Sequence, residues 1–173
     1  RNLSTIYMKE VLIKEYNNLK NLKLRSIEGD YTFKVNFING CTLEILGEKP
    51  GKFKVQFINQ DNNSTVYESE ISNNMWCKSN KKYYLNYLIQ VINLENNEII
   101  FKHIFNAEGK KVYIHLDSNA IGDTLAWFPY IEEFRKNHKC QVICSTFHNS
   151  WFNLSYPEIE FIKPGTEVMD LYA

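Results

Sequence analysis

The 173-residue sequence lacks the features that mark a membrane protein or a nucleic-acid-binding protein. Basic and acidic residues balance at 20 each, so no net charge favours binding to nucleic acid or to an anionic membrane. No apolar run is long enough to span a bilayer, and the amino terminus has no signal-peptide pattern. We therefore expect neither a nucleic-acid partner nor a transmembrane segment.

Cysteine is scarce, and its spacing excludes the common disulfide and metal frameworks. None of the 4 cysteines forms a CxxC pair. Cys140 and Cys144 lie about four strand residues apart, roughly 13 Å, which is too far for a disulfide or a shared metal ion. We predict buried, free thiols in a reducing compartment, which implies a cytoplasmic location.

The familiar catalytic motifs are also missing. The sequence contains no P-loop, no GxGxxG, no GxSxG and no His pair with metal-ligand spacing. His115 falls within a predicted buried strand and is interpreted as a core histidine. The remaining candidates for a functional role are polar side chains at the ends of strands.

Two periodicities divide the first part of the chain. Residues 4–23 have the spacing of an amphipathic helix, whereas residues 31–106 alternate with period two, as strands do. Turn signals separate the strands, and Asn39-Gly40 is a strong two-residue hairpin signal. We predict strands at residues 32–38, 41–46, 52–58, 65–71, 83–93 and 98–105. Short strands at this spacing predict a small all-β barrel or sandwich.

Residues 75–84 combine aromatic side chains with lysines. Such a cluster could bind single-stranded nucleic acid, a sugar or the edge of a protein strand. The alternative is an aromatic core strand next to a solvated loop. The neutral total charge argues against nucleic acid.

From about residue 109 the order becomes strand, helix, strand, short helix, strand, over residues 112–117, 124–137, 140–145, 149–154 and 159–162. Apolar strands without alternation, separated by helices, indicate a parallel sheet with helices on its faces. We expect the longer helix to bury five side chains: Leu125, Trp127, Phe128, Ile131 and Phe134. Doubly wound domains have roughly five or more strands. We therefore expect this chain to be the amino-terminal part of a longer protein.

The turn between the first of these strands and the longer helix is the best candidate for a site. In open α/β sheets, ligands bind beyond the carboxyl ends of the strands. Asp123 lies in this turn, as a candidate general base toward an acceptor hydroxyl. The alternative is a helix N-cap, worth about 1 kcal/mol. Asp117 is either a second carboxylate or a turn residue, and residues 145–148 follow the next strand at the same edge.

Particular stretches of the sequence resemble a known family. DSNAIGDTLAWFPYIEEF, followed by CQVICSTFHNSWF and YPEIEFIKPG, resembles the bacterial autotransporter heptosyltransferases, relatives of the lipopolysaccharide heptosyltransferases. KVNFINGCTLEILG and VYESEISNNMWCKSNKKYY resemble the β-barrel that precedes the transferase domain in this family. The implied fold class is α+β, with a small all-β barrel or sandwich followed by the first part of a Rossmann-like parallel sheet. The implied domains are an N-terminal helix (1–27), a β-barrel that catches the acceptor protein (28–108) and an incomplete glycosyltransferase domain (109–173).

The resemblance implies an inverting glycosyltransferase with Asp123 as its catalytic base. The enzyme would transfer a heptose-like sugar from an ADP-heptose-type donor to Ser hydroxyls of an autotransporter adhesin. The residues that would bind substrate are Ser118, Asn119, Ala120, Gly122, Thr124, Thr146 and His148. The alternative is a protein-binding β module on an enzyme whose acceptor is a surface glycan.

The same resemblance places the donor site outside these residues. The half that binds the sugar nucleotide, and a cysteine cluster that holds iron, would follow Ala173. No cofactor or metal is therefore expected within residues 1–173, and this part alone is expected to lack activity. The family also implies a homo-oligomer.

Overall fold

The computed structural model describes residues 25–173, with side chains from Gly29 onward. The chain divides into two compact units, the first ending at Phe105 and the second running from Asn106 to Ala173. This division lies close to the predicted boundary between residues 108 and 109. The helix predicted for residues 4–23 lies outside the described residues, and residues 25–27 belong to a strand.

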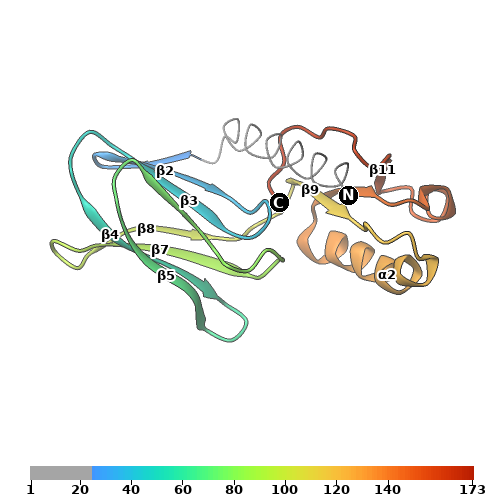
Figure 1. The fold of residues 1–173 in the computed structure, drawn as a ribbon, viewed down its shortest axis with the longest axis horizontal. Helices are drawn as coiled ribbons and strands as arrows, with labels where there is room; N and C mark the ends of the chain where they lie inside the picture. The colour runs from blue at the N-terminus through green and yellow to red at the C-terminus, as the bar shows by residue number, and fades with distance from the viewer. Residues whose placement is uncertain (1–24) are drawn as a thin grey trace, which may run out of the picture. The chain divides into compact units, whose positions relative to one another are not determined.

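The first unit is a sandwich of two four-stranded antiparallel sheets (Figure 1). The first sheet has the order β1-β2-β3-β6 and consists of β1 (Arg25–Glu28), β2 (Tyr31–Asn36), β3 (Thr42–Leu46) and β6 (Met75–Lys78). The second sheet has the order β5-β4-β7-β8 and consists of β4 (Lys52–Asn59), β5 (Ser64–Ser72), β7 (Tyr87–Asn93) and β8 (Ile99–Ile104). Both sheets are open. The sandwich alternative is therefore confirmed, and the β-barrel expected for residues 28–108 is wrong.

Alternating side chains explain why these two sheets pack on each other. Every second residue of β4 is buried, so Phe53, Val55 and Phe57 form one wall of the core. Aromatic rings then join the sheets. The ring of Phe33 in β2 stacks on that of Phe101 in β8, with centroids 4.4 Å apart. Residues of both sheets thus form one apolar layer between them.

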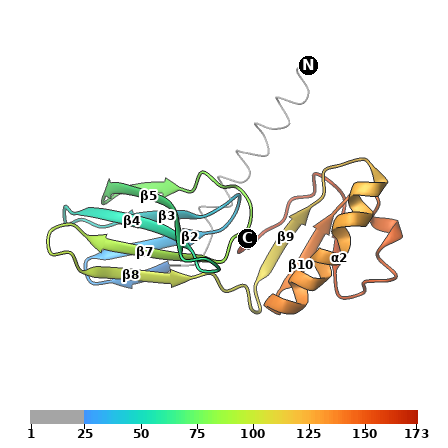
Figure 2. The same ribbon diagram turned by 90° about the horizontal axis from the view of Figure 1, so that it is seen from below.

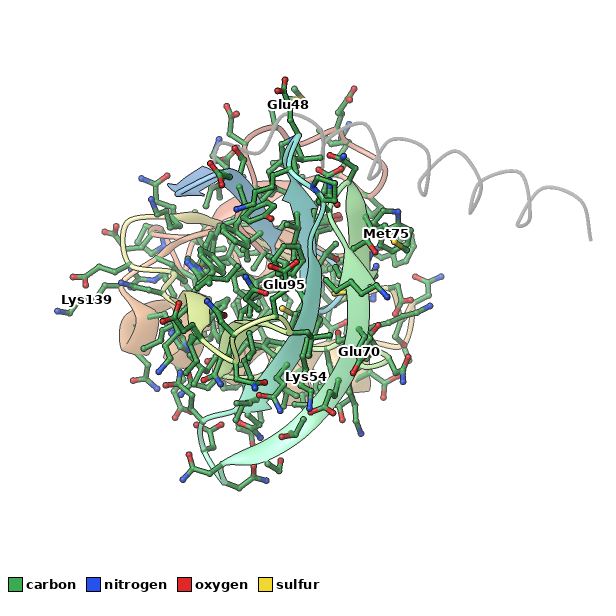
Figure 3. All side chains as sticks on the ribbon, turned by 90° about the vertical axis from the view of Figure 1, so that its left-hand side faces the viewer. Glu48, Lys54, Glu70, Met75, Glu95 and Lys139 are labelled. Carbon is green, nitrogen blue, oxygen red and sulfur yellow. The ribbon has the colours of Figure 1, made fainter. Side chains whose placement is uncertain are left out.

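The outer face of the second sheet carries polar cross-strand pairs. Lys54 of β4 and Glu70 of β5 are cross-strand partners on this face (Figure 3). Gln56 Nε2 donates a hydrogen bond to Glu68 Oε2 at 2.6 Å, and Lys54 Nζ lies 3.8 Å from Glu68 Oε1. Polar ladders on one face and apolar side chains on the other give the period-two pattern of the sequence.

The aromatic and basic segment 75–84 does not form a core strand. β6 ends at Lys78, and Trp76 within it is 60% exposed. Tyr83 and Tyr84 precede β7, which begins at Tyr87 rather than at residue 83 as predicted. The strand begins where a partner exists, because Tyr87 pairs with Asn59 at the end of β4.

The turn at Asn39-Gly40 is present, but the two-residue hairpin is wrong. Both residues have positive φ, 55° and 99°. The ladder between β2 and β3 nevertheless ends at the pair Asn36 and Thr42, so residues 37–41 form the connection. Other groups take the backbone donors of this segment, since Cys41 N donates to Ser79 Oγ at 3.0 Å.

The second unit is a three-stranded parallel sheet with the order β11-β10-β9 and one long helix (Figure 2). Its elements are β9 (Lys111–His115), α2 (Ile121–His138), β10 (Gln141–Ser145), the 3-10 helix η1 (Asn149–Trp151) and β11 (Glu160–Ile162). This is the strand and helix order that the sequence predicts. In the part of the chain that the structure describes, no helix combines the length and apolar character needed to cross a membrane.

Helix α2 packs on the sheet with a narrower face than predicted. Its buried residues are Thr124, Phe128 and Ile131, which recur at i, i+4 and i+7. The ring of Phe128 stacks on that of Phe152 at 4.0 Å. The expected burial of Trp127 is wrong, because this residue lies off the sheet-facing stripe and is 61% exposed. Leu125 is likewise exposed, and Phe134 is half-buried.

Candidate active site

The carboxyl ends of the three parallel strands meet at one edge of the sheet. Ser145 at the end of β10 is the register partner of both His115 in β9 and Ile162 in β11. Leu116 N donates to Ser145 O at 3.0 Å, so the loop after β9 leaves the sheet tied to β10. The 116–120 loop and residues 146–148 therefore begin at the same edge, where ligands of open α/β sheets bind.

Asp123 lies at this edge, in the first turn of α2, with its side chain exposed. Ser118 Oγ donates a hydrogen bond to Asp123 Oδ2 at 2.7 Å and accepts one from Ala120 N at 3.1 Å. Within residues 25–173, no hydrogen bond engages the other carboxylate oxygen, Oδ1. The carboxylate is thus held by one oxygen, and the second is open to accept a proton.

The interpretation of Asp123 as an N-cap is wrong. The residue before the helix is Ala120, whose backbone is extended and whose position has no side-chain capping bond. Asp123 is two residues inside the helix, where its negative charge faces the positive end of the helix dipole. Asp117, the other carboxylate of the turn, is exposed.

The loop after β10 lies beside the loop that leads to Asp123. The ring atom His148 Nε2 is 3.1 Å from Asn119 O, and because a carbonyl oxygen only accepts, Nε2 is the donor. Thr146 is buried, and its hydroxyl accepts from His148 N at 2.8 Å. The structure therefore brings Asn119 and His148 together, although 29 positions separate them in the sequence.

Asn149 is a residue of this edge that sequence reasoning missed. Its Oδ1 accepts from Thr146 N at 2.9 Å and from Thr146 Oγ1 at 3.1 Å. Its Nδ2 donates to Ile162 O at 2.6 Å, at the end of β11. The one available signal was its position, at the start of a short helix directly after the predicted ligand-edge residues 145–148.

The remaining predicted site residues surround the first turn of α2. Ala120 and Gly122 are exposed, and a Cβ added at Gly122 would meet no atom within 4 Å. Thr124 is fully buried, and its Oγ1 donates to Ala120 O at 3.4 Å. Gly122 thus leaves open space beside Asp123, whereas the Thr124 hydroxyl serves the helix itself.

Two other kinds of chemistry find no support at this edge. Burial raises the pKa of the Cys144 thiol, next to Ser145, to about 12, so this thiol stays protonated and is a poor nucleophile. All four cysteines are buried and free, as predicted. Among the described residues, no group of three His, Cys, Asp or Glu side chains could hold a metal ion. The described part of the chain therefore does not fit an iron site.

Comparison with known proteins connects this geometry to a family. No protein-family model matches the chain. It is 31% identical over 116 residues to the autotransporter heptosyltransferase BAHTCr of Citrobacter rodentium, which covers 66% of this chain and 28% of the relative. It is 29% identical over 152 residues to the autotransporter heptosyltransferase Aah of Escherichia coli, covering 87% of this chain and 37% of Aah. Its homologues are autotransporter heptosyltransferases.

A further relative is the inactive autotransporter heptosyltransferase BimC of Burkholderia thailandensis. It is 26% identical over 133 residues, which cover 76% of this chain and 30% of BimC. The family therefore includes both transferases and a member named as inactive. The resemblance read from the sequence is confirmed.

Solved structures show the same fold. The crystal structure of the iron-containing dodecameric glycosyltransferase TibC from enterotoxigenic E. coli matches with a TM-score of 0.72 and 24% identity, over 87% of this chain and 39% of TibC. A second TibC structure, in complex with ADP-D-beta-D-heptose, matches with a TM-score of 0.70. The chain spans 28–37% of the length of these three curated relatives.

Proposed function

We propose that this chain supplies the acceptor side of a heptosyltransferase, with Asp123 as the catalytic base. One observation carries the proposal. An exposed carboxylate, held by Ser118 Oγ at 2.7 Å, lies at the carboxyl edge of a parallel sheet in a homologue of the autotransporter heptosyltransferases. The second unit would then be the start of a Rossmann-like half of the enzyme.

The arrangement suits proton removal from an acceptor hydroxyl. As the hydroxyl oxygen attacks the anomeric carbon of the sugar donor, its proton passes to Asp123 Oδ1, and the bond from the sugar to the nucleoside diphosphate breaks. Attack from the face opposite the leaving group inverts the anomeric configuration. The hydrogen bond from Ser118 keeps the carboxylate in one orientation, so Oδ1 is directed toward the acceptor before the acceptor binds.

The donor and acceptor follow from the relatives. The proposed donor is an ADP-heptose-type sugar nucleotide, supported by TibC, which was solved with ADP-D-beta-D-heptose. The proposed acceptor is a Ser hydroxyl of an autotransporter adhesin, which the first unit would bind. We further propose a cytoplasmic homo-oligomer, supported by the dodecamer of TibC. No step of the proposal depends on a metal bound by residues 25–173.

The test is sugar transfer by the full-length enzyme carrying Asp123→Asn. This change keeps the shape of the side chain and removes its capacity to accept a proton. We expect kcat to fall by about 10²- to 10⁴-fold, the usual contribution of a general base. Glu133→Gln, the same kind of change at an exposed position of α2, serves as the matched control and is expected to retain full activity. Normal turnover by Asp123→Asn would refute the proposal.

A second candidate function has specific support in the relative BimC, which is named as inactive. The chain would then be a protein-binding module without transfer activity, with the β-sandwich as its binding part. The full-length wild type separates the two candidates. Incorporation of labelled heptose into an adhesin favours the transferase, and binding of the adhesin without incorporation favours the module.

A further inference from the structure

Two polar side chains tie together the three segments that build the ligand edge. Asn149 joins β10 to β11, because Oδ1 accepts from Thr146 N at 2.9 Å and Nδ2 donates to Ile162 O at 2.6 Å. Both bonds are made to backbone groups, so they fix the position of the backbone after β10 and at the end of β11. The start of η1 is thereby fixed to the carboxyl ends of two neighbouring strands.

His148 extends this link to the loop that follows β9. Its backbone N donates to Thr146 Oγ1 at 2.8 Å, and its ring Nε2 donates to Asn119 O at 3.1 Å. The residue before Asn119 is Ser118, whose hydroxyl holds the Asp123 carboxylate at 2.7 Å. Hydrogen bonds therefore lead from the end of β11 to Asn119, and the peptide bond between Asn119 and Ser118 connects them to the hydroxyl that holds the proposed base.

These bonds also use the side-chain donors of Thr146 and His148. The Thr146 hydroxyl accepts from His148 N and donates to Asn149 Oδ1, and His148 Nε2 donates to the Asn119 carbonyl. The Thr146 O–H and the His148 Nε2–H are therefore both used within the protein, and neither of these donors is left for a ligand. Their geometry fits the support of a loop better than contact with a ligand.

We propose that Asn149 and His148 form a clamp, by which the carboxyl ends of β10 and β11 hold the 116–120 loop and so position Asp123. The clamp rests on the proposed function of Asp123 and adds two positioning residues to it. His148 thus takes a supporting role in place of the substrate contact predicted from the sequence. The 116–120 loop has no regular secondary structure, so these side-chain bonds fix it where a helix or strand ladder would otherwise do so.

The first experiment compares His148→Leu with His148→Gln in the full-length enzyme. Leu removes the bond to Asn119 O, and Gln restores a side-chain N–H of similar reach. We expect His148→Leu to lower kcat by about 10- to 100-fold, since small misplacements of a reacting group have such effects. The acceptor KM should stay within about twofold, and His148→Gln should stay within about threefold of wild-type kcat. His138→Leu, about 22 Å along α2 from Asp123, is the control with unchanged kcat.

Three kinetic outcomes would overturn the clamp. One is a raised KM with unchanged kcat in His148→Leu, which marks a substrate contact. Another is equal loss in His148→Leu and His148→Gln, which marks a need for the imidazole itself. The third is no loss in either variant. Asn149→Asp keeps the acceptor for Thr146 N but loses the donor to Ile162 O. We expect this variant to lower kcat as His148→Leu does, with the acceptor KM again unchanged.

Hydrogen exchange tests the clamp without any sugar transfer. In the full-length protein, His148→Leu should speed exchange of the amides in residues 116–122 several-fold over His148→Gln, while the amides of β9 stay protected. Unchanged exchange in residues 116–122 would refute the clamp. If instead the wild type transfers no sugar but His148→Leu loosens the loop, the proposed function fails and the clamp stands.

Discussion

A side chain at Gly40 would be destabilising for two reasons: the backbone there has a positive φ, and a Cβ would clash with neighbouring atoms. Its φ of 99° lies in the region that favours glycine. A Cβ there would lie 2.1 Å from Lys81 O and 2.6 Å from Ser79 Oγ. Lys81 O is a backbone atom and cannot rotate out of the way as a side chain could. In a Gly40→Ala variant, the backbone at residue 40 and the backbone at Lys81 must therefore move apart.

The cost follows from what that movement breaks. Left-handed backbone costs an L-residue about 1–2 kcal/mol. The movement also disturbs the hydrogen bonds of Ser79 Oγ, which accepts from Cys41 N at 3.0 Å and donates to Lys81 O at 2.7 Å. A buried donor left without its partner costs about 1–3 kcal/mol. We expect Gly40→Ala to lower the free energy of unfolding by about 3 kcal/mol and Tm by about 15 °C.

Gly29 supplies the matched control within the same unit. Its φ is 60°, and a Cβ there would meet no atom within 4 Å, so Gly29→Ala carries backbone strain without a clash. We expect a loss of about 1 kcal/mol in that variant. Urea denaturation followed by circular dichroism measures both. If the two variants unfold at the same midpoint, the close approach of the Lys81 segment has no energetic weight and the reasoning is wrong.

Two further predictions concern buried side chains. Phe128→Ala should lower the free energy of unfolding of the second unit by about 3–5 kcal/mol, because the ring is 1% exposed and stacks on Phe152. Urea denaturation checks this against Tyr130→Ala, which is expected to change little because Tyr130 is 61% exposed. Burial raises the pKa of Cys77 to about 11 and that of Cys144 to about 12, from an ordinary value of 9.0. The unfolded chain therefore loses these protons first, so the contribution of the two thiols to stability is constant below about pH 9 and falls as the pH rises toward about 12. The urea midpoint should therefore be lower at about pH 10.5 than at about pH 8. Equal midpoints at the two pH values would contradict this prediction.

Most strands of the first unit were predictable because one face of each is buried and the other is solvated. β4, predicted at residues 52–58 and found at Lys52–Asn59, shows this alternation clearly. The start of β7 was not predictable, since Tyr83 and Tyr84 have strand propensity but lie beyond the last residue of β4 that can pair. Propensity describes a residue, whereas a strand needs a partner strand.

The candidate site shows the same division. The placement of Asp123 at a strand-to-helix turn followed from the local sequence, and the structure puts it in the first turn of α2. The contact between His148 and Asn119 and the role of Asn149 were not predictable, because each bond joins residues brought together by adjacent parallel strands. No local pattern specifies which loop a polar side chain will meet.

The sequence by itself determined what depends on neighbours along the chain: strand periodicity, the turn at Asn39-Gly40, the order of strands and helices, and the family resemblance. Tertiary structure decided that the first unit is two open sheets, and that Trp127 is exposed while Thr124 is buried. These outcomes depend on which surface packs against which other surface. Which surfaces pack together depends on the burial and fit of residues that are distant in the sequence. A local sequence pattern describes only one of the two surfaces in each contact.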